Sequence, residues 1–130
     1  MEIPVARWHQ AVRERSSRRQ FYTQIIEKWK IKKLQELIKK INYALEGLRI
    51  ILFQKEVDEI FTGVLGSYGK ISGAPAYLAF AGQEDTPKME EKIGYGGEAV
   101  ILEATALELG SCWVSGTFNA DKVIDDLDLK

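Results

Sequence analysis

Residues 93–118 read IGYGGEAVILEATALELGSCWVSGTF, and this stretch decides the fold of the 130-residue chain. A cluster of glycines opens it, and residues 95–109 then have the pattern of a helix that is apolar on almost every side. A helix without a broad polar face must be buried on most sides. We therefore expect a long central helix that packs against a sheet, a partner chain, or both. After a break at Gly110, residues 111–114 predict a short strand beside that core.

The size and composition predict one domain over residues 1–130 with a substantial core. Hydrophobic residues make up 45% of the chain and charged residues 28%, which is an ordinary globular balance. No apolar run approaches the 18 residues of a membrane span, and the N-terminal residues lack the pattern of a secretory signal. A lone cysteine, Cys112, suits a reducing compartment, so we expect a cytoplasmic protein.

The charges are divided unevenly between the two halves of the chain. Residues 1–55 hold 13 Lys/Arg and 5 Asp/Glu, a balance of +8, whereas residues 56–130 hold 5 and 14, a balance of −9. Such asymmetry indicates a nucleic-acid patch, attraction between the two halves, or a basic site for an anionic ligand. The charge distribution by itself leaves these three interpretations open.

The remaining elements are expected to be mostly helical. Helices are predicted over 5–15, 23–41, 56–65 and 120–127, a strand over 76–81, a strand or helix over 49–54, and a polar connection over 83–92. The apolar stripe predicted to bury the second helix consists of Ile26, Trp29, Leu34, Leu37, Ile38 and Ile41, and Asn42 is expected to end that helix. Because helices outnumber strands and do not alternate with them, we predict an α+β fold. Its small mixed or antiparallel sheet is flanked by helices and completed by dimerisation.

The sequence contains no complete nucleotide-binding or metal-binding motif of the common kinds. Residues 94–99 match the letters of a dinucleotide fingerprint, but no strand precedes them, so close helix packing explains the glycines better. Gly69 and Lys70 resemble the end of a phosphate loop, but Ile71 stands where Ser or Thr is required. One histidine and one cysteine cannot form a metal cluster. Any chemistry is therefore expected to belong to a bound cofactor.

A basic run after the first predicted helix suits an anionic cofactor. Arg15, Ser17 and Arg19 alternate, so an extended segment would project them to the same side. Arginine binds phosphate oxygens bidentately, and hydroxyls add donors, so the run fits a phosphate monoester. A solvated basic turn is the equally weighted alternative on this run by itself.

Three motifs together resemble the FMN-dependent nitroreductase family. Residues 15–21, RSSRRQF, are similar to its Arg-x-Ser-x-Arg-x-Phe signature, and residues 109–116, LGSCWVSG, to its second signature after a buried helix. Between them, residues 68–75, YGKISGAP, followed by AYLAF, resemble the loop and strand of the shorter, thermophile-type members. The three motifs occur in the family's order from about residue 8 to 118.

The resemblance implies an intertwined homodimer with two FMN sites at the subunit interface. It also implies hydride transfer from NAD(P)H through flavin N5 to a nitroaromatic, quinone or similar small-molecule acceptor, without a catalytic side chain. The cofactor-binding residues that it implies are Arg15, Ser16, Ser17 and Arg19 for the phosphate and ribityl oxygens, and Trp113, Val114, Ser115 and Gly116 beside the isoalloxazine.

The C-terminal end departs from the family pattern. Members normally continue after the second signature with an arm that supplies another basic residue to the phosphate, whereas this chain ends at Lys130. We therefore interpret the sequence as a shortened member. A non-catalytic, flavin-binding dimeric module is the main alternative. Nucleic-acid binding through the basic half is disfavoured, because its aromatic residues fit core positions better than a stacking surface.

Overall fold

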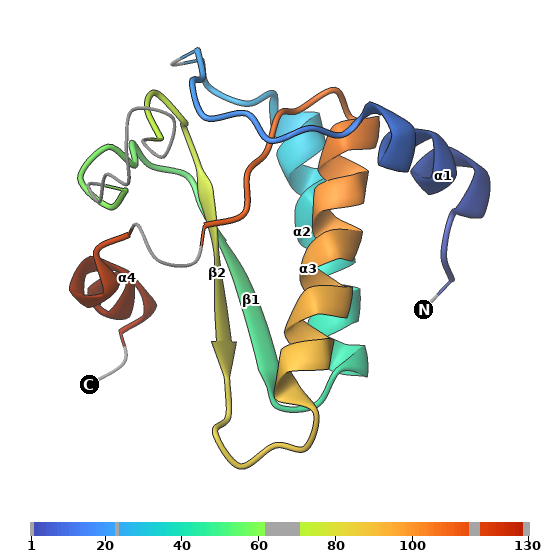
Figure 1. Cartoon of the computed structure of the whole chain (residues 1–130), viewed down its shortest axis with the longest axis vertical. Helices are drawn as coiled ribbons and strands as arrows, with labels where there is room; N and C mark the ends of the chain where they lie inside the picture. Colours follow the sequence, from blue (N-terminus) through green and yellow to red (C-terminus); the bar gives the residue numbers. More distant parts are fainter. Residues whose placement is uncertain (1, 23, 62–70, 115–117, 129–130) are drawn as a thin grey trace.

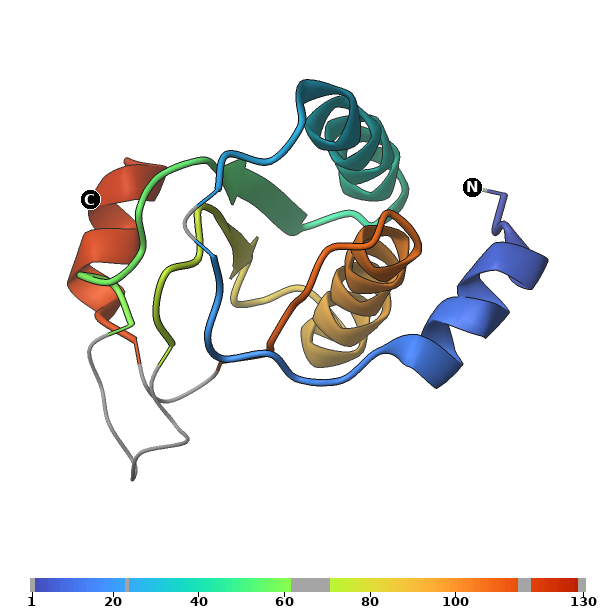
Figure 2. The same ribbon diagram turned by 90° about the horizontal axis from the view of Figure 1, so that it is seen from above.

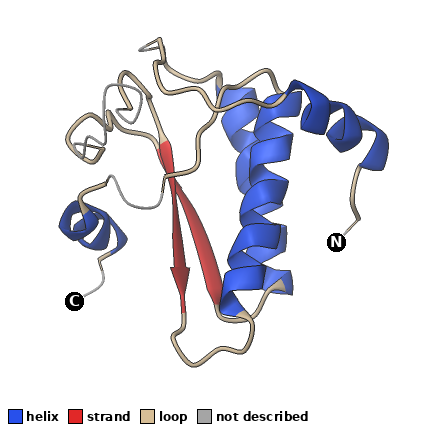
Figure 3. Cartoon of the chain, viewed as in Figure 1, coloured by secondary structure: helices blue, strands red, loops and turns tan. Residues whose placement is uncertain are grey.

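The computed structural model describes residues 2–22, 24–61, 71–114 and 118–128 (Figure 1). Within them the chain forms α1 (Val5–Glu14), α2 (Lys28–Ala44), β1 (Leu48–Phe53), β2 (Tyr77–Gly82), α3 (Met89–Ala106) and α4 (Ala120–Leu127). Helices α1, α2 and α3 lie on one side of the two strands and α4 lies on the other (Figure 3). The predicted α+β class is confirmed. No helix in the described ranges is both long enough and apolar enough to cross a membrane.

The sheet has a core on each of its two faces. Strands β1 and β2 are antiparallel, with Ile50 opposite Phe80. Because successive side chains of a strand point to opposite faces, Leu48 and Ile50 join one hydrophobic cluster, whereas Ile51 and Phe53 pack against another.

We call these two sides the helical layer and the loop layer. The helical layer comprises α1, α2 and α3, and its buried cluster contains Trp8, Leu34, Ile38, Ile41, Leu48, Ile50, Ala99, Val100 and Leu107. The loop layer comprises residues 54–61, 71–76, 112–114 and α4. The cluster beneath it contains Val57, Ile60, Ile71, Ala74, Tyr77, Ala79 and Leu127.

Helix α2 buries a narrower stripe than the sequence predicts. Its buried residues are Ile31, Leu34, Ile38 and Ile41, which recur every three or four positions. Trp29 was predicted in this stripe, but it lies two positions before Ile31, on another side of the helix. Its side chain is 52% exposed, and its indole N–H donates to Glu27 at 2.8 Å. The helix also begins at Lys28, so Ile26 precedes it.

Asn42 connects α2 to the sheet and does not end the helix. Its side-chain amide donates to the carbonyl of Ile50 at 2.9 Å and accepts from the Ile50 N–H at 2.8 Å. These bonds satisfy backbone groups on the edge of β1 that does not face β2. The helix runs on to Ala44, and Gly47, at φ +85°, turns the chain into β1. Of the two alternatives left open for residues 49–54, the strand is correct.

Helix α3 lies at the centre of the helical layer. It begins at Met89, so the prediction of a polar connection over 83–92 is wrong at its end; Glu90 and Glu91 favour a helix N-terminus there. Every residue from Gly96 to Leu107 is buried or half-buried, which confirms the expected burial. Arg7 of α1 forms an ion pair with the buried Glu103 at 2.6 Å and fastens α1 to this helix.

The predictions for the loop layer were less accurate. Residues 56–61 form a turn and not the start of a helix. In this turn Val57 and Ile60 are both buried, and the Asp58 side chain accepts a hydrogen bond from the Gly73 N–H at 2.9 Å. Residues 62–65 of that prediction lie outside the described residues. Residues 111–114 form no strand, and Ser111 makes only an isolated bridge. The helix over 120–127 is confirmed, with Asn119 as its N-cap.

Candidate functional site

The segment after α1 runs extended between the two layers. Ser17 forms a parallel bridge with Ser111, and Gln20 forms one with Ser72. The Arg18 N–H donates to the Ser111 carbonyl at 2.9 Å, and the Ser72 N–H donates to the Arg19 carbonyl at 2.9 Å. Figure 2 shows this segment beside the chain that leaves α3. The segment thus has the extended conformation on which the interpretation of the alternating Arg and Ser residues depends.

Arg15 lies where this segment leaves α1. Its backbone is extended at φ −69° and ψ 132°, so the helix ends and the side chain turns toward the chain after α3. The guanidinium Nη1 lies 3.4 Å from Ser111 Oγ, and Nη2 lies 3.5 Å from Ser17 Oγ. The Arg15 side chain is 20% exposed. A cation and two hydroxyls from distant parts of the chain thus share one small region.

Trp113 lies on the surface of α3 and stacks on the sheet. Its ring centroid is 5.3 Å from that of Phe80, with an angle of 23° between the planes. A Cβ atom at Gly97 would clash with Trp113 Cη2, so the indole can occupy this position only because residue 97 has no side chain. The prediction that these glycines allow close packing against the helix is supported at Gly96 and Gly97 and not at Gly94, which has open space beside it.

Glu98 joins the arginine to the tryptophan. Trp113 Nε1 donates to Glu98 Oε2 at 3.0 Å, and Glu98 Oε1 lies 4.0 Å from Arg15 Nε. The Glu98 side chain is 41% exposed, so water reaches this carboxylate. The two stretches that resemble the family's signatures therefore approach different oxygens of the same carboxylate.

The other predicted site residues are placed less directly. Arg19 is half-buried further along the segment, beside Ser72, and Ser16 is exposed. The Val114 side chain packs against the loop-layer cluster. Ser115 and Gly116 lie outside the described residues, as do residues 68–70 of the middle motif.

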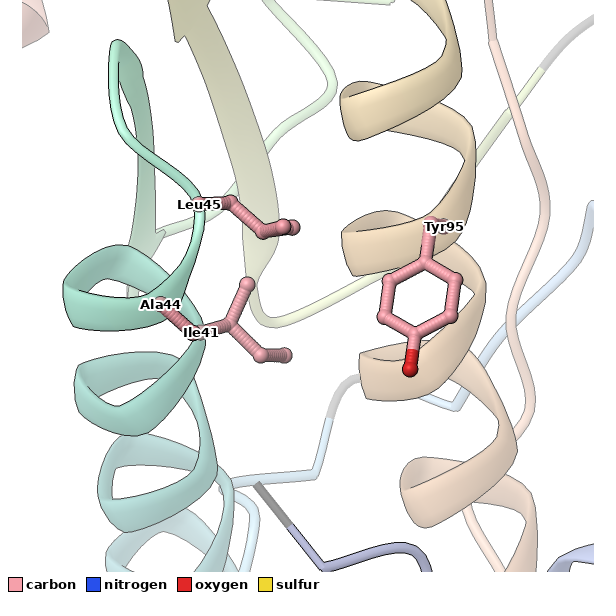
Figure 4. Close-up of a pocket in the computed structure, with 4 residues that line it drawn as sticks. All are labelled: Ile41, Ala44, Leu45 and Tyr95. Carbon is pink, nitrogen blue, oxygen red and sulfur yellow. The ribbon is translucent and has the colours of Figure 1, made fainter.

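Two apolar hollows lie beside α3. One, of about 350 Å³, lies between Ile41, Ala44 and Leu45 of the α2 end and Tyr95 of α3 (Figure 4). The other, of about 360 Å³, lies between α1 and α3; its lining includes Val5, Val12, Tyr95 and Glu98. Tyr95 borders both hollows. Each is lined mainly by apolar side chains, so neither resembles the cationic region around Arg15.

Comparison with known proteins identifies the family. The profile of the family described as "Putative TM nitroreductase" matches residues 8–129. The chain belongs to this nitroreductase family. Its fold is similar to that of an FMN-dependent nitroreductase from Clostridium difficile R20291, with a TM-score of 0.70 and 20% sequence identity over 92% of this chain and 78% of that one. No match is found among curated proteins.

In this nitroreductase-family chain, the structure brings together some of the residues that the sequence predicts for the site, and it adds two neighbours that were not assigned to it. Arg15, Ser17 and Trp113 were predicted and lie near one another. Ser111 was quoted in the second signature but was not assigned to the site, although the Ser-x-Arg run pairs with it directly. Glu98 was missed, because a single carboxylate on an apolar helix gives no signal until its partners are known.

Proposed function

We propose that the chain is an FMN-dependent oxidoreductase that takes hydride from NAD(P)H and reduces a nitroaromatic, a quinone or a similar acceptor. The proposal is supported by membership of the nitroreductase family and by the nitroreductase fold. The observation that carries it is the Arg15 guanidinium, held beside the hydroxyls of Ser17 and Ser111.

The chemistry of these donors fits a flavin mononucleotide. A phosphate monoester needs cations and neutral donors, and Arg15, Ser17 and Ser111 supply both from two segments. Arg19 brings a second cation to the same extended segment. A planar ring system needs flat apolar contacts, and the stacked pair of Phe80 and Trp113 offers them nearby.

In the proposed site the side chains bind and orient. Arg15 and Ser17 hold the phosphate, assisted by Arg19 and Ser16, and Ser111 keeps the Arg15 guanidinium in place. Trp113 and Val114 line the region of the ring system, with Ser115 and Gly116 included on the family resemblance. FMN, when bound, supplies two-electron transfer between the nicotinamide and the acceptor. Catalysis by the chain then consists of positioning both partners and excluding water.

We propose further that the active form is a homodimer with FMN at the interface. Four apolar side chains around the hollow between α1 and α3 are open to solvent: Ile3 (40% exposed), Val5 (70%), Val12 (60%) and Tyr95 (53%). Grouped apolar exposure of this kind favours association with another protein surface. A second copy of this chain is the partner that the family implies, and sedimentation equilibrium tests it by the mass of the particle.

The test of the function is a titration with FMN, followed by assays of NAD(P)H oxidation with nitroaromatic and quinone acceptors. Arg15→Ala removes a charge-assisted contact and is expected to weaken FMN binding by about ten- to hundredfold, equivalent to roughly 1.5–3 kcal/mol. Arg13→Ala, which removes an exposed arginine from the last turn of α1, is the matched control and should bind as the wild type does.

The titration and the assays separate the alternatives. Failure of the intact chain to bind FMN overturns the proposal. Binding without turnover of any acceptor identifies a non-catalytic, flavin-binding module. Binding with turnover, lost in Arg15→Ala and retained in Arg13→Ala, supports the oxidoreductase.

A further inference from the structure

Glu98 has two contacts with different physical consequences. Its contact with the Trp113 indole is a hydrogen bond of 3.0 Å to a neutral N–H donor. Its contact with Arg15 is an ionic approach of 4.0 Å to a guanidinium. The hydrogen bond needs only an acceptor oxygen, whereas the ionic contact needs the negative charge.

The hydrogen bond fixes Trp113 on α3. Gly97 leaves room for the indole, Phe80 stacks against it, and Glu98 accepts from its N–H. Three contacts from two elements thus hold the ring in one orientation, although it is 39% exposed. A glutamine at position 98 keeps an acceptor oxygen at the same distance from the backbone, and an alanine does not.

The ionic contact opposes the binding of an anion. A phosphate that approaches Arg15 must share the guanidinium with the Glu98 carboxylate, and it meets a like charge at close range. The Arg15 side chain is 20% exposed and the Glu98 side chain 41%, so solvent screens this repulsion in part. The negative charge of Glu98 is therefore expected to weaken the binding of a phosphate ligand to Arg15 and to matter little for a ligand without phosphate.

We infer that Glu98 is a positioning residue with two separable effects: its acceptor oxygen orients Trp113, and its charge competes with the cofactor phosphate for Arg15. This inference rests on the proposed function, because it takes the phosphate of FMN as the anion. According to this inference the Glu98 charge lowers the affinity for FMN, so removal of that charge strengthens FMN binding.

The experiment compares wild type, Glu98→Gln and Glu98→Ala in titrations with FMN and with riboflavin, which lacks the phosphate. Glu98→Gln is expected to bind FMN about fivefold more tightly than the wild type, in line with the strength of a partly exposed ion pair, and to bind riboflavin equally well. Glu36→Gln, an exposed position on α2, controls for the change in net charge and should leave both affinities unchanged.

A second measurement follows the indole N–H of Trp113 by ¹H–¹⁵N NMR without a ligand, with the resonance assigned through Trp113→Phe. The resonance should stay in place in Glu98→Gln and shift in Glu98→Ala. Equal shifts in both variants, or none in either, overturn the orienting effect.

The titrations also distinguish this inference from the proposed function. If the wild type binds FMN and Glu98→Gln binds it no more tightly, Glu98 does not compete with the phosphate for Arg15. The proposed function then still stands. A gain that appears equally with riboflavin also overturns it, because the phosphate is then not involved. Failure of every variant to bind FMN overturns the proposed function and the inference together.

Discussion

The two faces of the sheet are stabilised in different ways. In the helical layer, three helices present aliphatic side chains at regular spacing, and the cluster includes Ile41 and Val100, which have no exposure. In the loop layer the elements are short, and polar contacts tie them together. The Tyr77 hydroxyl donates to Asp126 at 2.5 Å, and Lys55 pairs with the same carboxylate at 3.0 Å.

This difference shows how a short element can be held on a sheet. Helix α4 buries only Leu127 among its eight residues, which gives it little apolar contact of its own. Its position depends on Asp126 and on the Asn119 N–H, which donates to the Ile60 carbonyl at 2.6 Å. Residues 15–21 connect the two layers, since Trp8 before them joins the helical cluster and Phe21 packs against the other. The candidate site therefore depends on both.

The largest expected effect comes from truncating a buried isoleucine in each of the two layers. Ile41→Ala in the helical layer should lower the free energy of unfolding by about 3–4 kcal/mol, because regular helices cannot close the cavity. Ile60→Ala in the loop layer should cost about 2–3 kcal/mol, since a turn can move into the space. The two isoleucines are 0% and 1% exposed, so the comparison is matched for burial.

Urea unfolding measures both variants against the wild type. An Ile60→Ala variant that is destabilised more than Ile41→Ala would show that the loop layer is the more rigidly packed side, and the contrast between the layers would be wrong. A variant that changes the slope of the unfolding free energy against urea concentration has not simply changed in stability. It has changed in the compactness of a state or has lost two-state unfolding.

A smaller effect tests how the helical layer supports Trp113. Gly97→Ala places a Cβ atom where the indole lies, so the ring must move, and we expect a loss of about 1–3 kcal/mol in unfolding free energy. Gly94→Ala lies in the same helix with no atom within 4 Å of the new Cβ, and it should stabilise the chain by about 0.5–1 kcal/mol.

Thermal unfolding and the fluorescence of Trp113 report on these glycine variants. If Gly97→Ala stabilised the protein as much as Gly94→Ala, α3 would not hold the indole as described.

The helical layer was largely predictable from the sequence, whereas in the loop layer only α4 was. Helical periodicity located α1 and α2, because a buried stripe repeats within one element, and apolarity on almost every side located most of α3. The turn at residues 56–61 was mistaken for a helix, because its Val57 and Ile60 also occur at helical spacing. Their burial is set by segments distant in the chain, which periodicity cannot reveal.

The same distinction applies to the candidate site. The alternation of Arg15 and Ser17 is local, so the sequence could show that these side chains would share a side in an extended segment. The contribution of Ser111 and Glu98 was not, because each acts through a partner 15 to 96 residues away in the chain. Trp29 shows the converse error: an aromatic residue near a regular stripe was counted as part of it.

The smallest effect tests the polar contacts of the loop layer. The hydrogen bond from Tyr77, followed by that from Lys55, holds the pKa of Asp126 below its ordinary value. A carboxyl group whose pKa is lowered by folding stabilises the fold above its unfolded pKa, and that stabilisation is lost as the pH falls through the folded value. Asp126→Asn should therefore cost about 1 kcal/mol at pH 7, and the difference from wild type should shrink as the pH falls below about 4.

Urea unfolding between pH 7 and pH 2.5 measures this difference, with Asp125→Asn as the control at the exposed neighbouring position of α4. The control should show a smaller effect at every pH, because the Asp125 side chain is directed to solvent. A cost for Asp126→Asn that stays constant with pH would mean that the shape of the side chain, and not its charge, holds α4. The loop layer would then depend on packing in the same way as the helical layer, and the contrast between the two faces of the sheet would be one of degree.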